Sequence, residues 1–134
     1  MVKILITEDS SVIQKMLKGI LEKEKTFEIV GISSDGEDAC LKVEQLKPDV
    51  ILMDVRMPKM TGVEAIKKIM SENPTPIIVL TSVEPVSEIK SEVLKYGAVS
   101  FMEKPKALDY SSIAFKLINE IKILSRLKLS KKVF

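Results

Sequence analysis

Histidine is absent from this chain of 134 residues. Its absence excludes catalytic triads that depend on histidine, histidine-ligated zinc and histidine-ligated haem. Cysteine is almost as scarce, because Cys40 is the single one. One cysteine cannot form an internal disulfide, so the fold must be held together by its core alone.

Long apolar runs are also missing. The longest uninterrupted stretches, such as 50–53 and 77–80, are far shorter than the roughly 20 residues that a membrane-spanning helix requires. The N-terminal segment reaches Glu8 and Asp9 too early to contain the apolar region of a signal peptide. These absences predict no membrane association and a cytoplasmic location, which suits a free thiol.

Neither sign of charge dominates the composition. The 21 Lys and Arg residues against 19 Asp and Glu residues give a formal net charge of +2. This balance provides no overall electrostatic attraction to nucleic acid or to an acidic membrane, so no direct nucleic-acid partner is expected. With 46% hydrophobic residues, the chain has enough apolar surface for the core of one globular domain.

Short β-rich runs alternate along the chain with segments of helical periodicity. The gaps between strands each contain apolar residues that share one helical face, as Val12, Met16 and Ile20 do. A last helix should begin near Asp109 or Tyr110, and its pattern allows an extension past Arg126. The expected strands are 2–7, 27–32, 50–53, 77–80 and 98–102.

Strict alternation of strands and helices predicts an α/β fold with a doubly wound parallel sheet. For five strands the common order is 2-1-3-4-5, which gives a flavodoxin-like three-layer sandwich with five helices. Such sheets bind ligands at the carboxyl ends of their strands, where the strand order reverses. The residues that follow each strand are therefore the candidates for a functional site.

Charged and hydroxyl residues follow four of the five expected strands. Glu8 and Asp9 follow the first, Asp54 the third, Thr81 the fourth and Lys104 the fifth. Like charges at about 4 Å repel by on the order of 4 kcal/mol at an effective dielectric constant of 20. Lys104 offsets part of this repulsion, and the remainder predicts a hard cation with oxygen ligands, namely Mg²⁺.

Each of these residues also has an ordinary structural explanation. Taken singly, Asp9 resembles a helix N-cap, Glu8 a solvated carboxylate and Lys104 a surface lysine. Thr81 resembles a strand end or a cap. Asp54 is different, because it directly follows the buried run Val-Ile-Leu-Met, and burial of a lone carboxylate is costly. The prediction of a functional site therefore rests on all five residues together rather than on any one of them.

Four sequence motifs carry a family resemblance that covers nearly the whole chain. They are Ile4-Leu5-Ile6-Thr7-Glu8-Asp9-Ser10, Asp49 to Pro58, Val79-Leu80-Thr81-Ser82 and Lys104-Pro105. With them the chain resembles the receiver domains of two-component response regulators. The resemblance implies a signalling phosphoacceptor rather than an enzyme, with a sensor histidine kinase and a downstream output protein or domain as partners. It also implies a monomer or a phosphorylation-dependent dimer.

The same resemblance implies a role for each candidate residue. Asp54 would be the phosphoacceptor, and Asp9 and Asp54 would bind Mg²⁺ directly. Glu8 would act through water, and Arg56 would contribute its backbone carbonyl to the metal.

Thr81 and Lys104 would bind the oxygens of the attached phosphoryl group. Thr81 and Phe101 would then transmit the change to the surface around the fourth helix, the fifth strand and the fifth helix. The departures from the family pattern are small: Thr61 stands where the family often has Asp, and Phe101 where Tyr is also common.

A finer resemblance is to the receivers of chemotaxis methylesterases, seen in Asn73 to Ile78 and in Gly97 to Phe101. The methylesterase domain itself is absent, so the chain is either a free-standing receiver or a fragment that regulates a missing output domain. Two alternatives from other classes share parts of the pattern. A flavodoxin-like nucleotide or flavin binder would require a phosphate-binding loop, and a dehalogenase-type phosphatase would require Asp where Arg56 stands.

The last residues form a short basic tail. We expect a receiver domain over residues 1–125 and a helix extension or the start of a linker over residues 126–134. In one interpretation the tail is a frayed helix end with solvated lysines. In the other it begins a linker or forms a docking element.

Overall fold

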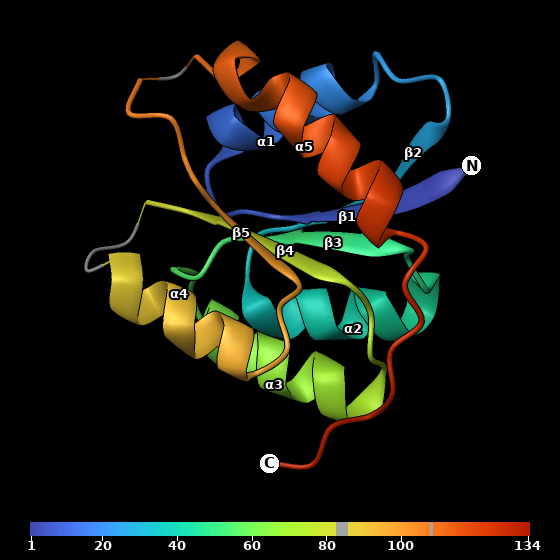
Figure 1. Ribbon diagram of the computed structural model, residues 1–134, viewed down its shortest axis with the longest axis vertical. Coiled ribbons are helices and arrows are strands. Elements are labelled where there is room, and N and C mark those ends of the chain that lie inside the picture. The colour runs from blue at the N-terminus through green and yellow to red at the C-terminus, as the bar shows by residue number, and fades with distance from the viewer. Residues whose placement is uncertain (83–85, 108) are drawn as a thin grey trace.

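The structure, a computed structural model, describes residues 1–82, 86–107 and 109–134. In that part of the chain five parallel strands form one sheet between two layers of helices (Figure 1). The strand order β2-β1-β3-β4-β5 confirms the predicted doubly wound topology. The strands are β1 (Val2–Thr7), β2 (Phe27–Ser33), β3 (Val50–Met53), β4 (Ile77–Thr81) and β5 (Ser100–Glu103).

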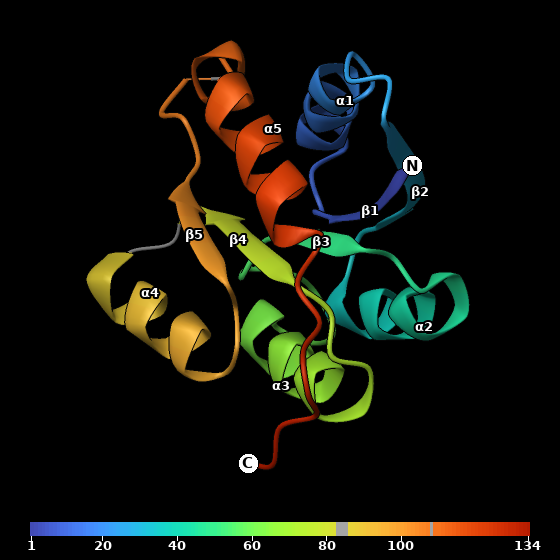
Figure 2. The ribbon, with the colours of Figure 1, turned by 45° about the vertical axis from the view of Figure 1, so that its right-hand side comes forward.

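The helices divide between the two faces of the sheet (Figure 2). Helices α1 and α5 cover one face, and α2, α3 and α4 cover the other. This arrangement confirms the three-layer sandwich. The helices are α1 (Ser11–Leu21), α2 (Gly36–Leu46), α3 (Gly62–Glu72), α4 (Val86–Lys95) and α5 (Ser111–Leu124).

The core consists of two apolar clusters, one on each side of the sheet. Along β3, Ile51 and Met53 belong to the cluster under α2, α3 and α4, whereas Val50 and Leu52 belong to the cluster under α1 and α5. Successive strand side chains point to opposite faces, so a central parallel strand is apolar throughout. Asp54 therefore directly follows a strand whose side chains are buried on both faces of the sheet.

Side-chain caps fix where two of the helices on one face begin. The Asp35 carboxylate accepts a hydrogen bond from the Asp38 backbone N–H at 2.8 Å, and the Thr61 hydroxyl accepts one from the Glu64 N–H at 3.2 Å. Each cap satisfies an otherwise unpaired donor and contributes about 1 kcal/mol. The Thr61 cap also explains the departure from the family pattern, because threonine and aspartate both serve as N-caps.

The C-terminal segment differs from the expected helix extension. Helix α5 ends at Leu124, so residues 126–134 are not the helix extension that the pattern allowed, and the alternative of a linker start stays a prediction. Leu124 packs against one apolar cluster and Leu129 against the other, so the chain must cross the edge of the sheet between them. A helix rises only about 1.5 Å per residue, whereas an extended chain covers about 3.3 Å. An extended segment therefore reaches from one face of the sheet to the other with fewer residues than a helix would need.

Among residues 1–82, 86–107 and 109–134, no helix has the length and apolar character needed to span a membrane.

Candidate functional site

The structure brings the predicted site residues to one edge of the sheet. Backbone hydrogen bonds hold the segments together there: the Asp54 N–H donates to the Thr7 carbonyl at 3.0 Å, and the Lys104 N–H to the Thr81 carbonyl at 3.0 Å. Parallel pairing thus aligns the carboxyl ends of β1, β3, β4 and β5. The residues that the sequence placed at the carboxyl edge therefore lie together there.

Lys104 is the central cation of this edge. Its Nζ lies 2.5 Å from a Glu8 carboxylate oxygen and 2.8 Å from Asp54 Oδ2, and its side chain is only 9% exposed. Burial by itself lowers the pKa of Lys104. The hydrogen bonds and charges of Asp54 and Glu8 together outweigh burial, so the pKa is raised and the ammonium form is stabilised.

Glu8 is far more buried than an ordinary surface carboxylate. The residue is 2% exposed, which overturns its interpretation as a solvated side chain. Its Oε2 accepts a hydrogen bond from the Ser10 N–H at 3.0 Å. Burial, together with the negative charge of Asp54, raises the pKa of Glu8 in spite of the opposing effects of Lys104 and Ser10.

Asp54 is buried and held from two sides. Its Oδ2 accepts from Lys104, and its Oδ1 accepts from the Arg56 backbone N–H at 3.3 Å. The loop that follows passes close to the start of α3, where a Cβ on Gly62 would lie 2.4 Å from the Asp54 carbonyl oxygen. Only glycine permits this approach, so Gly62 helps to set the position of Asp54.

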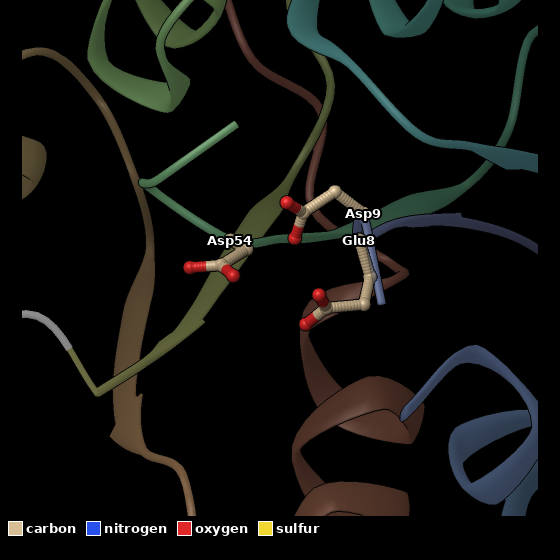
Figure 3. Close-up of side chains that lie close together, drawn as sticks. All are labelled: Glu8, Asp9 and Asp54. Carbon is tan, nitrogen blue, oxygen red and sulfur yellow. The ribbon is translucent and has the colours of Figure 1, made fainter. Parts of the chain in front are cut away.

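Asp9 does not serve as the helix cap. The Ser10 hydroxyl occupies that role and accepts a hydrogen bond from the Ile13 N–H at 3.3 Å. Asp9 is exposed on the rim, next to the two buried acids (Figure 3). Carboxylate oxygens of Glu8, Asp9 and Asp54 all lie within 4.8 Å of one another. A set of three carboxylates fits a hard divalent cation, which prefers oxygen ligands.

Thr81 and Phe101 lie on neighbouring strands behind the acidic residues. Thr81 is fully buried at the end of β4. Phe101 is half-buried on β5 and packs against the apolar cluster under α2, α3 and α4. Thr81 thus lies at the carboxyl edge, and Phe101 lies against the cluster that also contains Val93 of α4.

Two residues near the site were not foreseen from the sequence. The amide nitrogen of Gln14 donates to the Glu8 carbonyl at 2.5 Å and to the Ser34 hydroxyl at 3.2 Å. Tyr110 is buried at the start of α5, and burial raises the pKa of its hydroxyl. The spacing of Gln14 one turn after the Ser10 cap was the only sequence signal for either residue.

Comparison with known proteins agrees with this geometry. The family model of the response regulator receiver domain matches residues 4–111. A protein-glutamate methylesterase/protein-glutamine glutaminase of Syntrophus aciditrophicus is 39% identical over 132 residues, which cover 96% of this chain and 38% of that protein. The chain thus spans well under half of this relative.

Two solved structures extend the comparison. The response regulator domain of Thermotoga maritima CheB is 35% identical, with a TM-score of 0.90 and coverage of 95% of this chain and 98% of that one. The receiver domain of the Pseudomonas aeruginosa sensor histidine kinase PA1611, solved with magnesium in its active-site cleft, is 25% identical. Its TM-score is 0.76, with coverage of 92% and 96%.

The fold and its acidic edge define a phosphoacceptor domain of two-component signalling. The chain belongs to the response regulator receiver domain family, and its relatives confirm the resemblance to methylesterase receivers. Membership of this family decides against the flavodoxin-like binder and the dehalogenase-type phosphatase.

Proposed function

We propose that Asp54 accepts a phosphoryl group from the phosphohistidine of a sensor kinase. The observation that carries this proposal is the position of one buried carboxylate at the end of the central strand, bonded to Lys104 and beside two further acids. No other described carboxylate combines these three features. The histidine that this chain lacks is supplied by the kinase.

A magnesium ion is proposed to be bound by Asp9 and Asp54 directly, by Glu8 through water, and by the Arg56 backbone carbonyl. The donor set supports this assignment, because three carboxylates lie together and the single buried lysine among them cannot balance their charge. When bound, the ion offsets negative charge on the phosphoryl oxygens during transfer. The magnesium ion coordinated in the active-site cleft of the PA1611 receiver domain supports the same assignment.

In the proposed transfer an Asp54 carboxylate oxygen forms a bond to phosphorus. The bond between phosphorus and the histidine nitrogen breaks, and its electron pair stays on that nitrogen. Lys104 Nζ, 2.8 Å from Asp54 Oδ2, is placed to donate to an oxygen of the attached phosphoryl group. The contribution of the protein is therefore positioning and charge compensation rather than acid or base chemistry.

Thr81 and Phe101 are proposed to transmit the phosphorylation of Asp54 to the surface of the domain. A phosphoryl group adds about −1.5 to −2 charge, which attracts the Thr81 hydroxyl. Movement of Thr81 leaves space into which the Phe101 ring turns. Two or three hydrogen bonds to charged groups, at roughly 1.5–3 kcal/mol each, supply the roughly 5.5 kcal/mol needed to invert a 1:99 population.

The output is a separate proposal. We infer that residues 1–125 regulate a methylesterase domain that follows in the full-length protein, because the aligned relative is a methylesterase of which this chain matches 38%. On this proposal, residues 126–134 are the start of the linker. A sensor histidine kinase and the output domain are the partners.

The test is the intact mass of the protein after incubation with acetyl phosphate, with and without Mg²⁺. The parent should gain one phosphoryl group only with Mg²⁺, and Asp54→Asn should gain none. Asp49→Asn is the matched control, because Asp49 precedes the same strand that Asp54 follows. Equal labelling of Asp54→Asn and the parent would show that the acceptor is another residue.

A further inference from the structure

The C-terminal residues 126–134, here called the strap, lie across the molecule instead of extending from it (Figure 2). The strap starts beside the amino ends of β3 and β4 and continues to the helices on the far face. There the Lys132 N–H donates to the Met70 carbonyl of α3 at 2.9 Å. Leu129 packs against the apolar cluster under α2, α3 and α4. The strap is therefore attached by both backbone and apolar contacts.

An aromatic contact fixes the far end of the strap. The Phe134 ring meets the Tyr96 ring edge-on, with centroids 5.5 Å apart and an interplanar angle of 77°. Tyr96 follows the end of α4, and Lys67 of α3 places its Nζ 4.2 Å from the same ring. The strap thus contacts the residue after α4 through an aromatic pair, and Lys67 of α3 adds a cation–π contact to the same Tyr96 ring.

Gly97 shapes the surface on which the strap lies. Its φ of +119° favours glycine, and an added Cβ would lie 2.9 Å from the Met70 side chain and 3.0 Å from that of Lys132. The surface between α3 and the end of α4 can therefore receive the strap because position 97 has no side chain.

The strap and the proposed switch residue contact the same part of the core. Phe101, Tyr96 and Leu129 are all partly buried side chains packed against one cluster, which also contains the fully buried Val93 of α4. Protein interiors are close-packed, so a ring that turns at the margin of a cluster alters the surface offered to its neighbours. In the structure the strap is docked while Lys104 bridges Glu8 and Asp54.

We propose that the surface formed by Met70 of α3 and by Tyr96 and Gly97 after α4 is a docking site for the strap, and that phosphorylation of Asp54 releases the strap from it. The release rests on the proposed function, whereas the docking rests on the contacts above. Release follows because turning Phe101 removes the fit between the cluster and the strap. The released strap no longer covers Met70 and the Tyr96 ring.

Docking is tested by trypsin cleavage after Lys128, followed by mass spectrometry. Phe134→Ala removes the ring contact and should speed cleavage about two- to tenfold, the factor that an aromatic pair provides. Phe115→Ala is the matched control, because this ring is 82% exposed on α5. Equal rates for Phe134→Ala and the parent would overturn docking.

The coupling is tested with Mg²⁺ and beryllium fluoride as the phosphoryl analogue. In the parent this probe should raise the cleavage rate after Lys128 by about fivefold or more. Phe134→Ala should bind the probe more tightly, because coupling between two equilibria is reciprocal. Asp54→Asn should show neither effect.

The outcomes separate the two proposals. Binding of the probe with an unchanged cleavage rate would overturn the coupling and leave the proposed function intact. Absence of binding to the parent would overturn the proposed function and the coupling together, while the effect of Phe134→Ala would still report docking. Faster cleavage with the probe in Asp54→Asn would show that the strap responds to another site.

Discussion

The carboxyl edge of the sheet and the interior directly behind it have opposite compositions. Ile51, Leu52 and Val79 are completely or almost completely buried and purely apolar, whereas Glu8 and Asp54, at the ends of β1 and β3, share one lysine. The interior stabilises the fold through apolar burial, at about 25 cal/mol per Å². The edge concentrates like charges that a structure selected only for stability would not retain. The difference indicates that the edge is built for binding.

The largest expected effect concerns the cation at the edge. Lys104→Met should lower the free energy of unfolding by about 3–5 kcal/mol in metal-free buffer, because it leaves two buried carboxylates unpaired. Urea denaturation measures the change. Lys106→Met, at an exposed position two residues away, should stay within about 0.5 kcal/mol of the parent. A loss in Lys104→Met no greater than in this control would mean that the edge does not need its cation.

The pH dependence of that loss follows from the raised pKa of Lys104. A raised pKa means that the folded protein binds the proton more tightly than the unfolded chain does. The contribution of Lys104 is therefore complete below the ordinary lysine value of 10.5 and disappears as the pH rises through the raised value. On the alkaline side of neutrality, the difference in stability between parent and Lys104→Met should persist to that range and shrink within it.

In the apolar interior, the free energy of unfolding should depend on the volume of a side chain rather than on its charge. Leu52→Ala is expected to lower the free energy of unfolding by about 2–5 kcal/mol, because it removes methyl groups from a close-packed site. Leu41→Ala, on the surface of α2, is the control and should change it by about 0.5 kcal/mol at most. If Leu52→Ala matched this control, the interior would not be the source of stability.

The smallest expected effect has the opposite sign. Asp54→Asn leaves Lys104 paired with Glu8 alone and removes the repulsion between the two acids. The free energy of unfolding in metal-free buffer should therefore rise, by about 1 kcal/mol or less. Addition of Mg²⁺ should stabilise the parent more than the variant. If Asp54→Asn lowered the free energy of unfolding as much as Leu52→Ala does, the contrast between the edge and the interior would be contradicted.

Much of this organisation was predictable from the sequence. Apolar runs such as Val50 to Met53 identify central strands, and parallel topology then requires the residues after them to meet at one edge. The predicted site therefore needed no knowledge of side-chain contacts. The boundaries were less exact, because β5 begins at Ser100 rather than at Ala98.

Other features depended on packing that a linear pattern does not contain. Adjacent acids look alike in a sequence, yet Glu8 is buried and Asp9 is exposed in the connection between β1 and α1, which Ser10 caps. The basic pattern of the strap allowed either a helix extension or the start of a linker, so it could not predict where the strap lies. Its actual course is set by the apolar surface that receives Leu129 on the opposite face.

The central claim is that Asp54 itself carries the phosphoryl group. Borohydride reduces an acyl phosphate to the corresponding alcohol, so it converts a phosphorylated aspartate into homoserine. After phosphorylation with acetyl phosphate and Mg²⁺, reduction and digestion, peptide mass spectrometry should find homoserine at position 54 only. Homoserine at Asp9 or at any other aspartate, with Asp54 unchanged, would contradict the account.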